Sequence, residues 1–314
     1  RWVGDMHIEA DEDSVLVLTG SQQGIDLACR ALLNPGDTVL VERPTYLAAL
    51  QLFQMYGARV IDVPSDENGM DMEAAAAAAA RYQPRLVYVI PTFQNPTGIC
   101  WSIERRQQLA ALAEEHDMVI LEDDPYGRLR YESEHIPAIA GIDNLQRSIY
   151  LGSFSKIISP GLRVGYAVTH PALRRALVIG KQGTDLHTSN LSQRIVAEFG
   201  HRGTLERHIP TICAQYKQNR DLMLQQLQKR FPEGTSWNRP QGGLFLWVAL
   251  PEQVSTTRLL EKAISRKVAF IPGVPFFADG GGDNCMRLNF SNASHDNIVT
   301  GITRLSETIE EYYL

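Results

Sequence analysis

One lysine of the sequence, Lys156, lies where a chemically active amine would be expected. It follows the apolar run 148–152 and the triplet Ser153-Phe154-Ser155, so it is predicted to stand where a β-strand leaves a sheet. A lysine partly removed from water at such a point would have a lowered pKa and could act as an amine nucleophile. Most lysines are solvated surface charges, so the surrounding residues must decide between the two interpretations.

Hydroxyl and guanidinium groups near Lys156 predict a phosphate site. Ser153, Ser155 and Arg163 offer this combination within a short span, and it recognises phosphate through charge-assisted hydrogen bonds. The segment 20–22, Gly-Ser-Gln, opens a predicted helix whose free N–H groups favour an anion, so Ser21 and Gln22 are candidates too. Plainer interpretations are an N-cap for the serine and a surface ion pair for the arginine.

An acidic residue and its neighbours predict the aromatic part of the same ligand. Asp123 closes the apolar run 118–121, where a carboxylate needs a cationic partner, and a protonated pyridine nitrogen would serve. That protonation makes the ring of pyridoxal phosphate a better electron sink. Tyr126 and Asn95 are placed to hydrogen-bond the ring's phenolic oxygen, and Tyr46 could stack on the ring. Turn formation by the aspartate and the asparagine, and core packing by Tyr46, are the alternatives.

Arg287 is the candidate for substrate binding. It lies in the apolar run 286–290, where a guanidinium needs a carboxylate partner. A bidentate grip on a substrate α-carboxylate, with Asn95 nearby, would supply one. An ion pair between two domains is the alternative.

These residues require a sheet to bring them together. Short β-branched runs alternate with helical patterns, which predicts an α/β fold with a mainly parallel sheet and helices on both faces. The ligand site of such a sheet lies at the carboxyl ends of its strands. A long amphipathic helix at 204–230 followed by further strands predicts a second, smaller α+β unit that begins near residue 209, so we expect domains at 1–208 and 209–314. The predicted strands are 15–19, 38–41, 59–63, 86–90, 118–121, 148–152 and 164–168, then 243–250, 268–271 and 286–290, and the helices are 22–33, 46–56, 72–81, 103–116 and 171–181.

Composition narrows the class of protein. The chain has 314 residues, is 44% hydrophobic and carries a formal net charge of -6, without a dense Lys/Arg run, so small molecules are expected as partners rather than nucleic acid. The four cysteines are widely separated and form no CxxC pair, which favours reduced thiols, no metal site and a cytoplasmic location. No apolar run is long enough to span a membrane.

Six motifs in order resemble the class I/II aminotransferases of fold type I. They are Gly20-Ser21-Gln22-Gln23, Asn95-Pro96-Thr97-Gly98, Asp123-x-x-Tyr126, Ser153-x-Ser155-Lys156, the run 160–165 (PGLRVG) and the run 287–291 (RLNFS). Each is weak alone, but six in register over nearly the whole chain are specific. The segment 181–188 (KQGTDLHT) and the pair Thr45-Tyr46 are similar to the 2-aminoadipate and kynurenine aminotransferase subgroup, and to the aminotransferase-like domain of MocR-type regulators.

The resemblance implies a seven-stranded, mainly parallel sheet, a small C-terminal domain and a homodimer that binds pyridoxal 5'-phosphate. Lys156 would carry the cofactor as a Schiff base and would shuttle a proton between the substrate Cα and the cofactor's C4' atom, with Asp123 and Tyr126 as the other catalytic residues. The implied reaction moves an amino group from an α-amino acid to a 2-oxo acid, with 2-oxoglutarate as the expected acceptor. A PLP-binding effector domain of a MocR/GntR-type transcription regulator, or a PLP lyase or decarboxylase, is the alternative. Family members also have an N-terminal segment with a Tyr-Gly-x-x-x-Gly stretch, and this chain begins after it.

Overall fold

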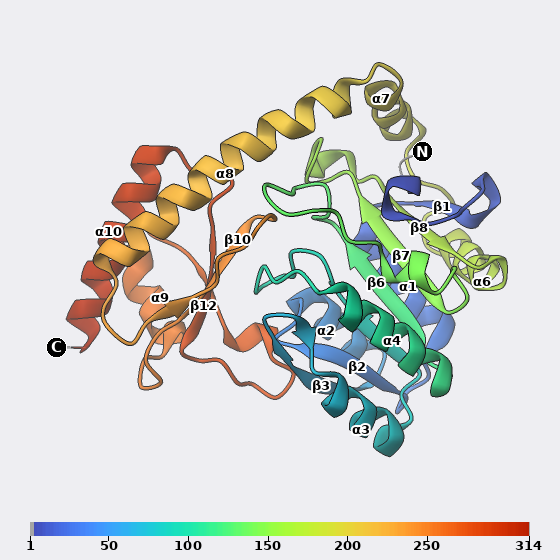
Figure 1. The fold of residues 1–314 in the computed structure, drawn as a ribbon, viewed down its shortest axis with the longest axis horizontal. Coiled ribbons are helices and arrows are strands. Elements are labelled where there is room, and N and C mark those ends of the chain that lie inside the picture. Colours follow the sequence, from blue (N-terminus) through green and yellow to red (C-terminus); the bar gives the residue numbers. More distant parts are fainter. Residues whose placement is uncertain (1–2, 314) are drawn as a thin grey trace.

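A computed structural model describes residues 3–313 of the chain as two sheets with their covering helices. The large sheet has eight strands in the order β1-β8-β7-β6-β5-β2-β3-β4 (Figure 1). Strands β2, β3, β5, β6 and β7 run parallel, whereas β8 is antiparallel to both β7 and β1. The bounds are β1 Val15–Leu18, β2 Thr38–Arg43, β3 Arg59–Asp66, β4 Gly69–Met70, β5 Leu86–Val89, β6 Val119–Asp124, β7 Ser148–Ser153 and β8 Gly165–Thr169.

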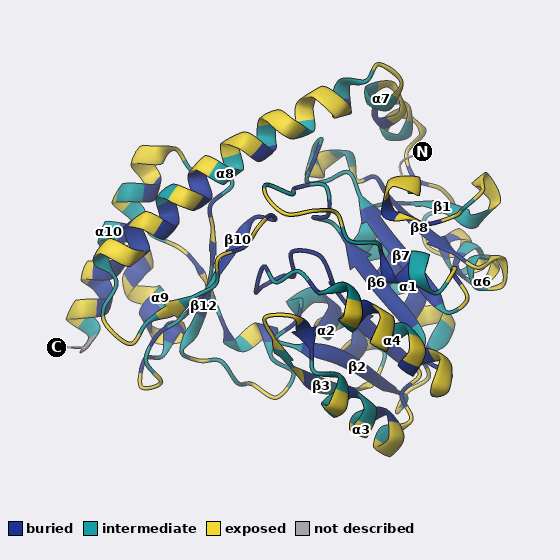
Figure 2. Ribbon diagram, viewed as in Figure 1, coloured by how far each residue is buried: buried dark blue, intermediate teal, exposed yellow. Residues whose placement is uncertain are grey.

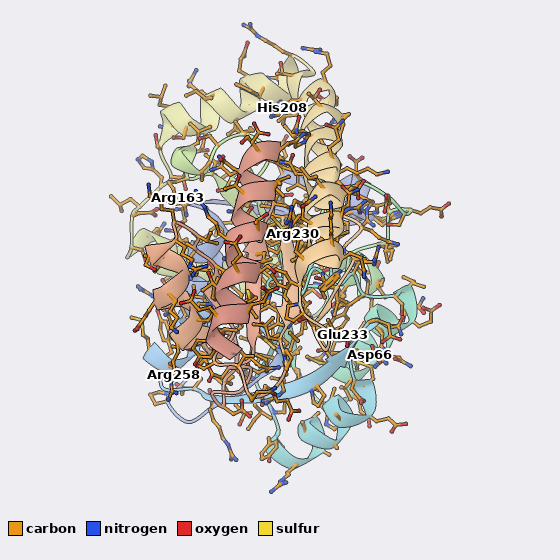
Figure 3. The ribbon with its side chains drawn as sticks, turned by 90° about the vertical axis from the view of Figure 1, so that its left-hand side faces the viewer. Asp66, Arg163, His208, Arg230, Glu233 and Arg258 are labelled. Carbon is orange, nitrogen blue, oxygen red and sulfur yellow. The ribbon has the colours of Figure 1, made fainter. Side chains whose placement is uncertain are left out.

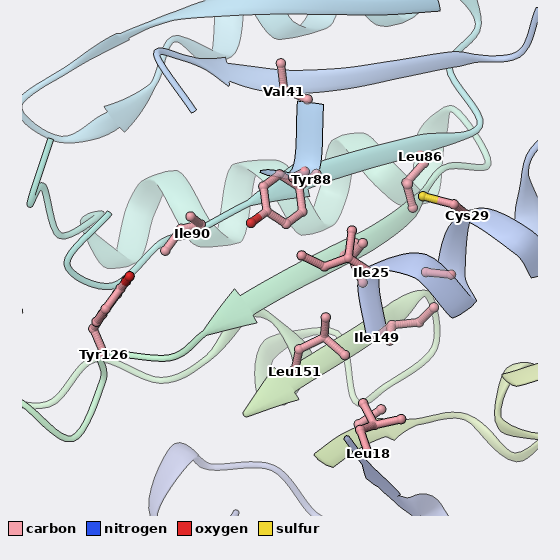
Figure 4. Packing of buried hydrophobic residues seen from close by; sticks show 14 of the residues in the cluster. Leu18, Ile25, Cys29, Val41, Leu86, Tyr88, Ile90, Tyr126, Ile149 and Leu151 are labelled. Carbon is pink, nitrogen blue, oxygen red and sulfur yellow. The ribbon is translucent and has the colours of Figure 1, made fainter. Parts of the chain in front are cut away.

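Side chains on alternate positions of the central strands pack against helices on opposite faces. Tyr88 and Leu121 face the core formed with α1 and α2, which also contains Ile25 of α1; Figure 4 shows Ile25 near Tyr88. Val87 and Ile120, one position away, face the core formed with α3 and α4. Both faces are therefore apolar, as expected for a sheet covered by helices on both sides. The helices are α1 Ser21–Leu32, α2 Leu47–Met55, α3 Met72–Tyr82, α4 Ile103–Glu115, α5 Ile139–Ile142 and α6 Pro171–Gln182.

A long helix joins this unit to the smaller one. Helix α7 (Asn190–His201) is followed by α8 (Thr204–Arg230), which runs without a break from the large sheet's side of the molecule to the small unit (Figure 1). The expected domain boundary at 208/209 therefore falls inside a continuous helix. Figure 3 shows α8 and α10 side by side on the small unit, with Arg230 labelled at the end of α8.

The small unit has a four-stranded antiparallel sheet in the order β11-β12-β10-β9. Its core is built by the sheet together with α8, α9 and α10. The bounds are β9 Ser236–Trp237, β10 Phe245–Ala249, β11 Ile271–Pro272, β12 Cys285–Asn289, α9 Thr256–Ser265 and α10 His295–Tyr313, and the 3-10 helices of the chain are η1 Gly4–Met6, η2 Glu12–Ser14, η3 Pro160–Leu162 and η4 Val274–Phe276.

Most of the predicted elements are confirmed, with some corrections. The seven-stranded sheet is present, and the two-residue strand β4 extends its edge as an eighth. The predicted strand 268–271 is wrong, because the backbone pairs with β12 only at Ile271–Pro272. Strand β6 continues through Asp123 to Asp124, so Asp123 lies within the strand rather than after it. Helix α7 was not predicted.

The burial pattern shows where a ligand can enter. The central strands are buried along their length, while helices α3, α4 and α8 each expose one face to solvent (Figure 2). The carboxyl ends of β5, β6 and β7 lie at one edge of the sheet and face the small unit (Figure 1). The four cysteines are free, and no helix in the described part of the chain could cross a membrane.

Candidate active site

A cleft of about 130 Å³ lies at the edge of the large sheet where the carboxyl ends of β6 and β7 are found. Every residue predicted to bind the cofactor lines it, although these residues come from six separate segments of the chain. The lining residues are Ser21, Gln22, Tyr46, Ile90, Asn95, Asp123, Pro125, Tyr126, Ser153, Ser155, Lys156, Pro160 and Arg163. Strands β1, β6 and β7 end at the same edge, which explains how the segments 20–22, 123–126 and 153–156 meet there.

The Asp123 carboxyl group is buried in the wall of the cleft, with only 3% of the residue exposed. Its Oδ2 atom accepts a hydrogen bond of 3.0 Å from the Tyr88 hydroxyl, while its Oδ1 atom is buried and has no hydrogen-bond partner. Burial raises the pKa of Asp123 to about 7, and the Tyr88 hydrogen bond offsets this only in part. An unpaired carboxylate oxygen at this depth is costly, so the site suits a ligand that brings an N–H donor.

The amine of Lys156 lies in the same cleft, after β7 ends at Ser153. Burial lowers the pKa of Lys156, and the positive charges of Arg287 and Arg163 lower it further, against the opposing effect of Asp123. A larger share of this amine is therefore unprotonated near neutral pH than in a solvated lysine, which is the state that attacks a carbonyl carbon.

The start of α1 and the Arg163 side chain form the polar end of the cleft. Gly20 has a φ of 82°, and a Cβ added there would lie 2.4 Å from Arg163 Nη2, so the arginine packs directly on the glycine. Arg163 donates a hydrogen bond of 3.4 Å to the Thr19 carbonyl. The N-cap position belongs to Gly20 and no side chain caps the helix, so the capping interpretation of Ser21 is wrong. The helix start is open to an anion.

Arg287 extends from β12 of the small unit to Asn95, one of the residues that line the cleft. Its Nη1 atom donates a hydrogen bond of 2.6 Å to Asn95 Oδ1, and Asn95 Nδ2 lies 3.4 Å from the Tyr126 hydroxyl. The guanidinium carbon lies 4.1 Å from the ring centroid of Phe245, and the Nε atom is buried without a partner. Among the described residues Arg287 forms no ion pair with a carboxylate, so the interdomain ion pair is wrong. Burial lowers the pKa of Arg287, as expected for a cation that still lacks an anionic partner.

Sequence reasoning missed two features of the site. Tyr88, which orients Asp123, lies in the middle of β5, where its alternation with buried aliphatic residues indicates only core packing. Phe245 and Phe276 flank the Arg287 guanidinium, and only the fold brings these three distant residues together.

A model of the family described as aminotransferase class I and II matches residues 2–305. The chain belongs to the class I and II aminotransferases. Among similar proteins, the aromatic-amino-acid aminotransferase 1 of Thermococcus litoralis is 42% identical to this aminotransferase over 317 residues, which cover 99% of this chain and 76% of that protein.

Two solved structures of aminotransferases resemble this one closely. The Pyrococcus horikoshii kynurenine aminotransferase in complex with PMP has 43% identity and a TM-score of 0.95, over 100% of this chain and 79% of that chain. The α-aminoadipate aminotransferase LysN of Thermus thermophilus, complexed with N-(5'-phosphopyridoxyl)-L-leucine, has 38% identity and a TM-score of 0.94, over 99% of this chain and 79% of that chain. The cofactor of the aminotransferase is pyridoxal 5'-phosphate.

The residues of the aminotransferase cleft fit this cofactor. The orphaned Oδ1 atom of Asp123 can accept a hydrogen bond from a pyridine N–H group. The uncapped start of α1, with Arg163 packed on Gly20, suits a phosphate. The buried amine of Lys156 lies in the same cleft and suits an aldehyde.

Proposed function

We propose that this aminotransferase moves the amino group of an α-amino acid with an aromatic or long side chain to 2-oxoglutarate. The names of the similar proteins support the donor class, since they act on aromatic amino acids, kynurenine or 2-aminoadipate. The observation that carries the proposal is that Lys156 and Asp123 line one cleft, while Arg287 is hydrogen-bonded to Asn95, another residue of that cleft. These groups suit a carbonyl carbon, a ring nitrogen and a carboxylate respectively.

Lys156 and Asp123 are proposed to perform the central chemistry. When bound, the cofactor supplies an electron sink that stabilises negative charge at the substrate Cα. Lys156 Nζ would hold the cofactor's aldehyde carbon, and as a free amine it would carry a proton between the substrate Cα and the cofactor's C4' atom. The Asp123 carboxylate keeps the ring nitrogen protonated.

The remaining residues of the cleft are proposed to hold and orient the cofactor. Tyr126 and Asn95 would hydrogen-bond the ring's phenolic oxygen, and Tyr46 would stack on the ring. The phosphate is held by charge-assisted and main-chain hydrogen bonds. The residues proposed for the phosphate are Ser21, Gln22, Ser153, Ser155 and Arg163.

Arg287 is proposed to bind the substrate α-carboxylate. Its Nη1 atom is fixed by Asn95, while its Nε atom is left without a partner. A bidentate pair with a carboxylate would satisfy that donor. Either substrate of the exchange, amino acid or 2-oxo acid, carries this group, so one arginine serves both half-reactions.

We further propose that the aminotransferase is a cytoplasmic homodimer with domains 1–208 and 209–314. Exposed apolar side chains support the dimer: Leu186 is 73% exposed and Leu191 is 71% exposed. Large exposed apolar groups on neighbouring positions are typical of an interaction surface. The four free cysteines support the cytoplasmic location.

A screen of amino donors with 2-oxoglutarate tests the proposed reaction. The purified protein, saturated with pyridoxal 5'-phosphate, is given each amino acid in turn, and glutamate and the new 2-oxo acid are measured. Glutamate formed with aromatic or long-chain donors supports the proposal. Release of carbon dioxide or a broken carbon skeleton contradicts it in favour of a decarboxylase or lyase. Cofactor binding with no transfer from any donor contradicts it in favour of a regulator domain.

A further inference from the structure

A buried lysine outside the cleft, Lys181, lies at the end of α6 with only 4% of the residue exposed. Its Nζ atom lies 2.8 Å and 2.9 Å from the two carboxylate oxygens of Asp185. The same atom donates hydrogen bonds of 2.8 Å to Gln23 Oε1 and 3.1 Å to Thr188 Oγ1. The ammonium group is therefore fully engaged and has no donor left for a ligand.

This cluster connects directly to the turn between β1 and α1. Gln23 Oε1 accepts a second hydrogen bond of 2.9 Å from the Thr19 main-chain N–H, and Gln23 Nε2 donates one of 2.9 Å to Asp185 Oδ2. The Thr19 hydroxyl donates a hydrogen bond of 2.7 Å to the same Asp185 oxygen. Residues 19 and 23 flank Gly20, Ser21 and Gln22, so both ends of the turn are fixed by one ion pair.

The residues of the cluster support the turn without lining the cleft. On the cleft side, Arg163 packs on Gly20, and on the sheet side a Cβ at Gly165 would lie 2.8 Å from the Ser21 main-chain nitrogen. Lys181 and Asp185 supply the third support. Burial raises the pKa of Asp185, but the hydrogen bonds from Lys181, Thr19 and Gln23 outweigh it, so the carboxylate stays charged.

Stability alone does not explain this arrangement. Burying a lysine carries a large desolvation cost, and apolar residues of similar volume commonly stabilise a fold as well as a buried ion pair does. The ion pair fixes the orientation of its neighbours, because four hydrogen bonds hold the Gln23 amide and the Thr19 hydroxyl in one orientation. An open helix start binds an anion well only if its N–H groups are held in place.

We propose that Lys181 and Asp185 are positioning residues for the cofactor's phosphate group. They hold Gln23 and Thr19 so that the N–H groups of Ser21 and Gln22 face the phosphate, without touching it themselves. The inference rests on the proposed role of Ser21 and Gln22. According to this inference, the affinity for the cofactor's phosphate depends in part on the segment 181–188, which does not line the cleft.

Two ligands that differ only in the phosphate test this inference. Binding of pyridoxal 5'-phosphate and of pyridoxal to the cofactor-free protein is titrated by absorbance, for the natural protein and for Lys181→Met. Loss of the charge-assisted network is expected to weaken binding of the phosphorylated ligand by about ten-fold or more, as for other hydrogen bonds to charged groups. Pyridoxal affinity should stay unchanged, because that ligand makes no use of the turn.

Control variants separate this role from a general effect on folding. Arg220→Met removes a second nearly buried cation, which pairs with Glu132 and Asp221 far from the turn, and should weaken neither ligand selectively. If Lys181→Met does not fold, two other variants replace it. Lys181→Met/Asp185→Leu removes both charges together, and Thr188→Val removes one hydroxyl partner of Lys181. Each is expected to weaken binding of pyridoxal 5'-phosphate but not of pyridoxal. An equal loss for both ligands, or no loss for either, would overturn the inference. If the natural protein binds neither ligand, the proposed cofactor roles fail instead.

Discussion

The two oxygens of the Asp123 carboxyl group have different surroundings, and this difference determines how the protein should respond to pH. One oxygen accepts the Tyr88 hydroxyl hydrogen bond, and the other is buried without a partner. In the cofactor-free protein, burial raises the pKa of Asp123 from 3.8 to about 7. The cofactor's ring N–H group is proposed to supply the missing partner.

We predict that the cofactor-free protein loses stability between about pH 4 and pH 7 through Asp123. The folded carboxyl group stays protonated there while the unfolded one ionises, so its contribution is fully present below the unfolded pKa and is lost as pH rises through the folded pKa. At about 1.4 kcal/mol per pKa unit, the loss is at most about 4 kcal/mol. Asp123→Asn should remove this loss, and Asp13→Asn, at an exposed carboxyl, should not. The check is the free energy of unfolding in urea across this pH range; equal pH dependence in Asp123→Asn and the natural protein would contradict the prediction.

A second prediction concerns the pH at which Lys156 becomes reactive. Because burial and the charges of Arg287 and Arg163 lower its pKa, its reaction with pyridoxal should rise with pH at a midpoint below that of an ordinary lysine. Arg287→Gln removes one of these positive charges and should move the midpoint upward, whereas Asp123→Asn should move it downward. The rate of pyridoxal attachment to the cofactor-free protein gives the midpoint. A shift of the opposite sign in either variant would contradict the proposed effect of these charges on the pKa of Lys156.

Individual residues also show how far the sequence could predict the site. Lys156 and Asp123 were found because each charge follows an apolar run, and Arg163 was found because it lies close in sequence to the hydroxyl groups of Ser153 and Ser155. Tyr88 was not found, because a tyrosine within a buried strand has the same pattern whether or not its hydroxyl meets a carboxylate. For Arg287 the sequence predicted a carboxylate partner, whereas the hydrogen bond in the structure goes to the Asn95 amide oxygen, 192 positions away along the chain.

At the scale of elements, the turn from β1 into α1 depends on its glycine. Gly20 has a φ of 82° and lies against the Arg163 guanidinium, so a side chain there is strained and also displaces the arginine. Gly36 has a φ of 94° but nothing within 4 Å of an added Cβ. The two glycines share a backbone requirement but differ in their neighbours.

Replacing each of these glycines by alanine should separate strain from binding. Both variants should lose about 1–2 kcal/mol of folding stability from the left-handed backbone. Only Gly20→Ala should also weaken pyridoxal 5'-phosphate binding, by about ten-fold. The added methyl group displaces the Arg163 guanidinium, which is proposed to bind the phosphate. Thermal unfolding and cofactor titration measure the two effects. An unchanged cofactor affinity in Gly20→Ala would remove the turn from the proposed phosphate site.

Element boundaries were predicted well where a strong local signal exists. Helix α8 matches the predicted 204–230, and α3 begins after Asp71, whose carboxylate caps the first turn. The strand at 268–271 was wrong because a short apolar run does not reveal which of its residues find a pairing partner. Helix α7 carries a local signal that was overlooked, since Ser189 caps its start by accepting a hydrogen bond from the Ser192 main-chain N–H.

At the scale of the whole molecule, the site is completed by the small unit. Arg287 belongs to β12 of the small sheet, yet its hydrogen-bond partner Asn95 belongs to the large unit. Helix α8 runs continuously between the two units and links their positions (Figure 1). The grip on the substrate therefore depends on how the two units are held together.

We predict that Arg287→Gln raises KM for both the amino acid and the 2-oxo acid. Loss of a buried charge pair costs about 2–5 kcal/mol, so the increase should be at least about thirty-fold. Cofactor affinity should change little, because Arg287 is not proposed to touch the cofactor. Arg258→Gln, at an exposed position of α9 (Figure 3), is the control and should behave as the natural protein. An Arg287→Gln enzyme with unchanged KM for both substrates would contradict the assignment.

The most direct test of the account is to find which lysine binds the cofactor covalently. The protein loaded with pyridoxal 5'-phosphate is treated with borohydride, which makes the bond permanent, then digested and mapped by mass spectrometry. We predict a phosphopyridoxyl group on the peptide that contains Lys156, lost in Lys156→Ala and retained in Lys181→Met at saturating cofactor. A label on another lysine, or none on Lys156, would contradict the central claim.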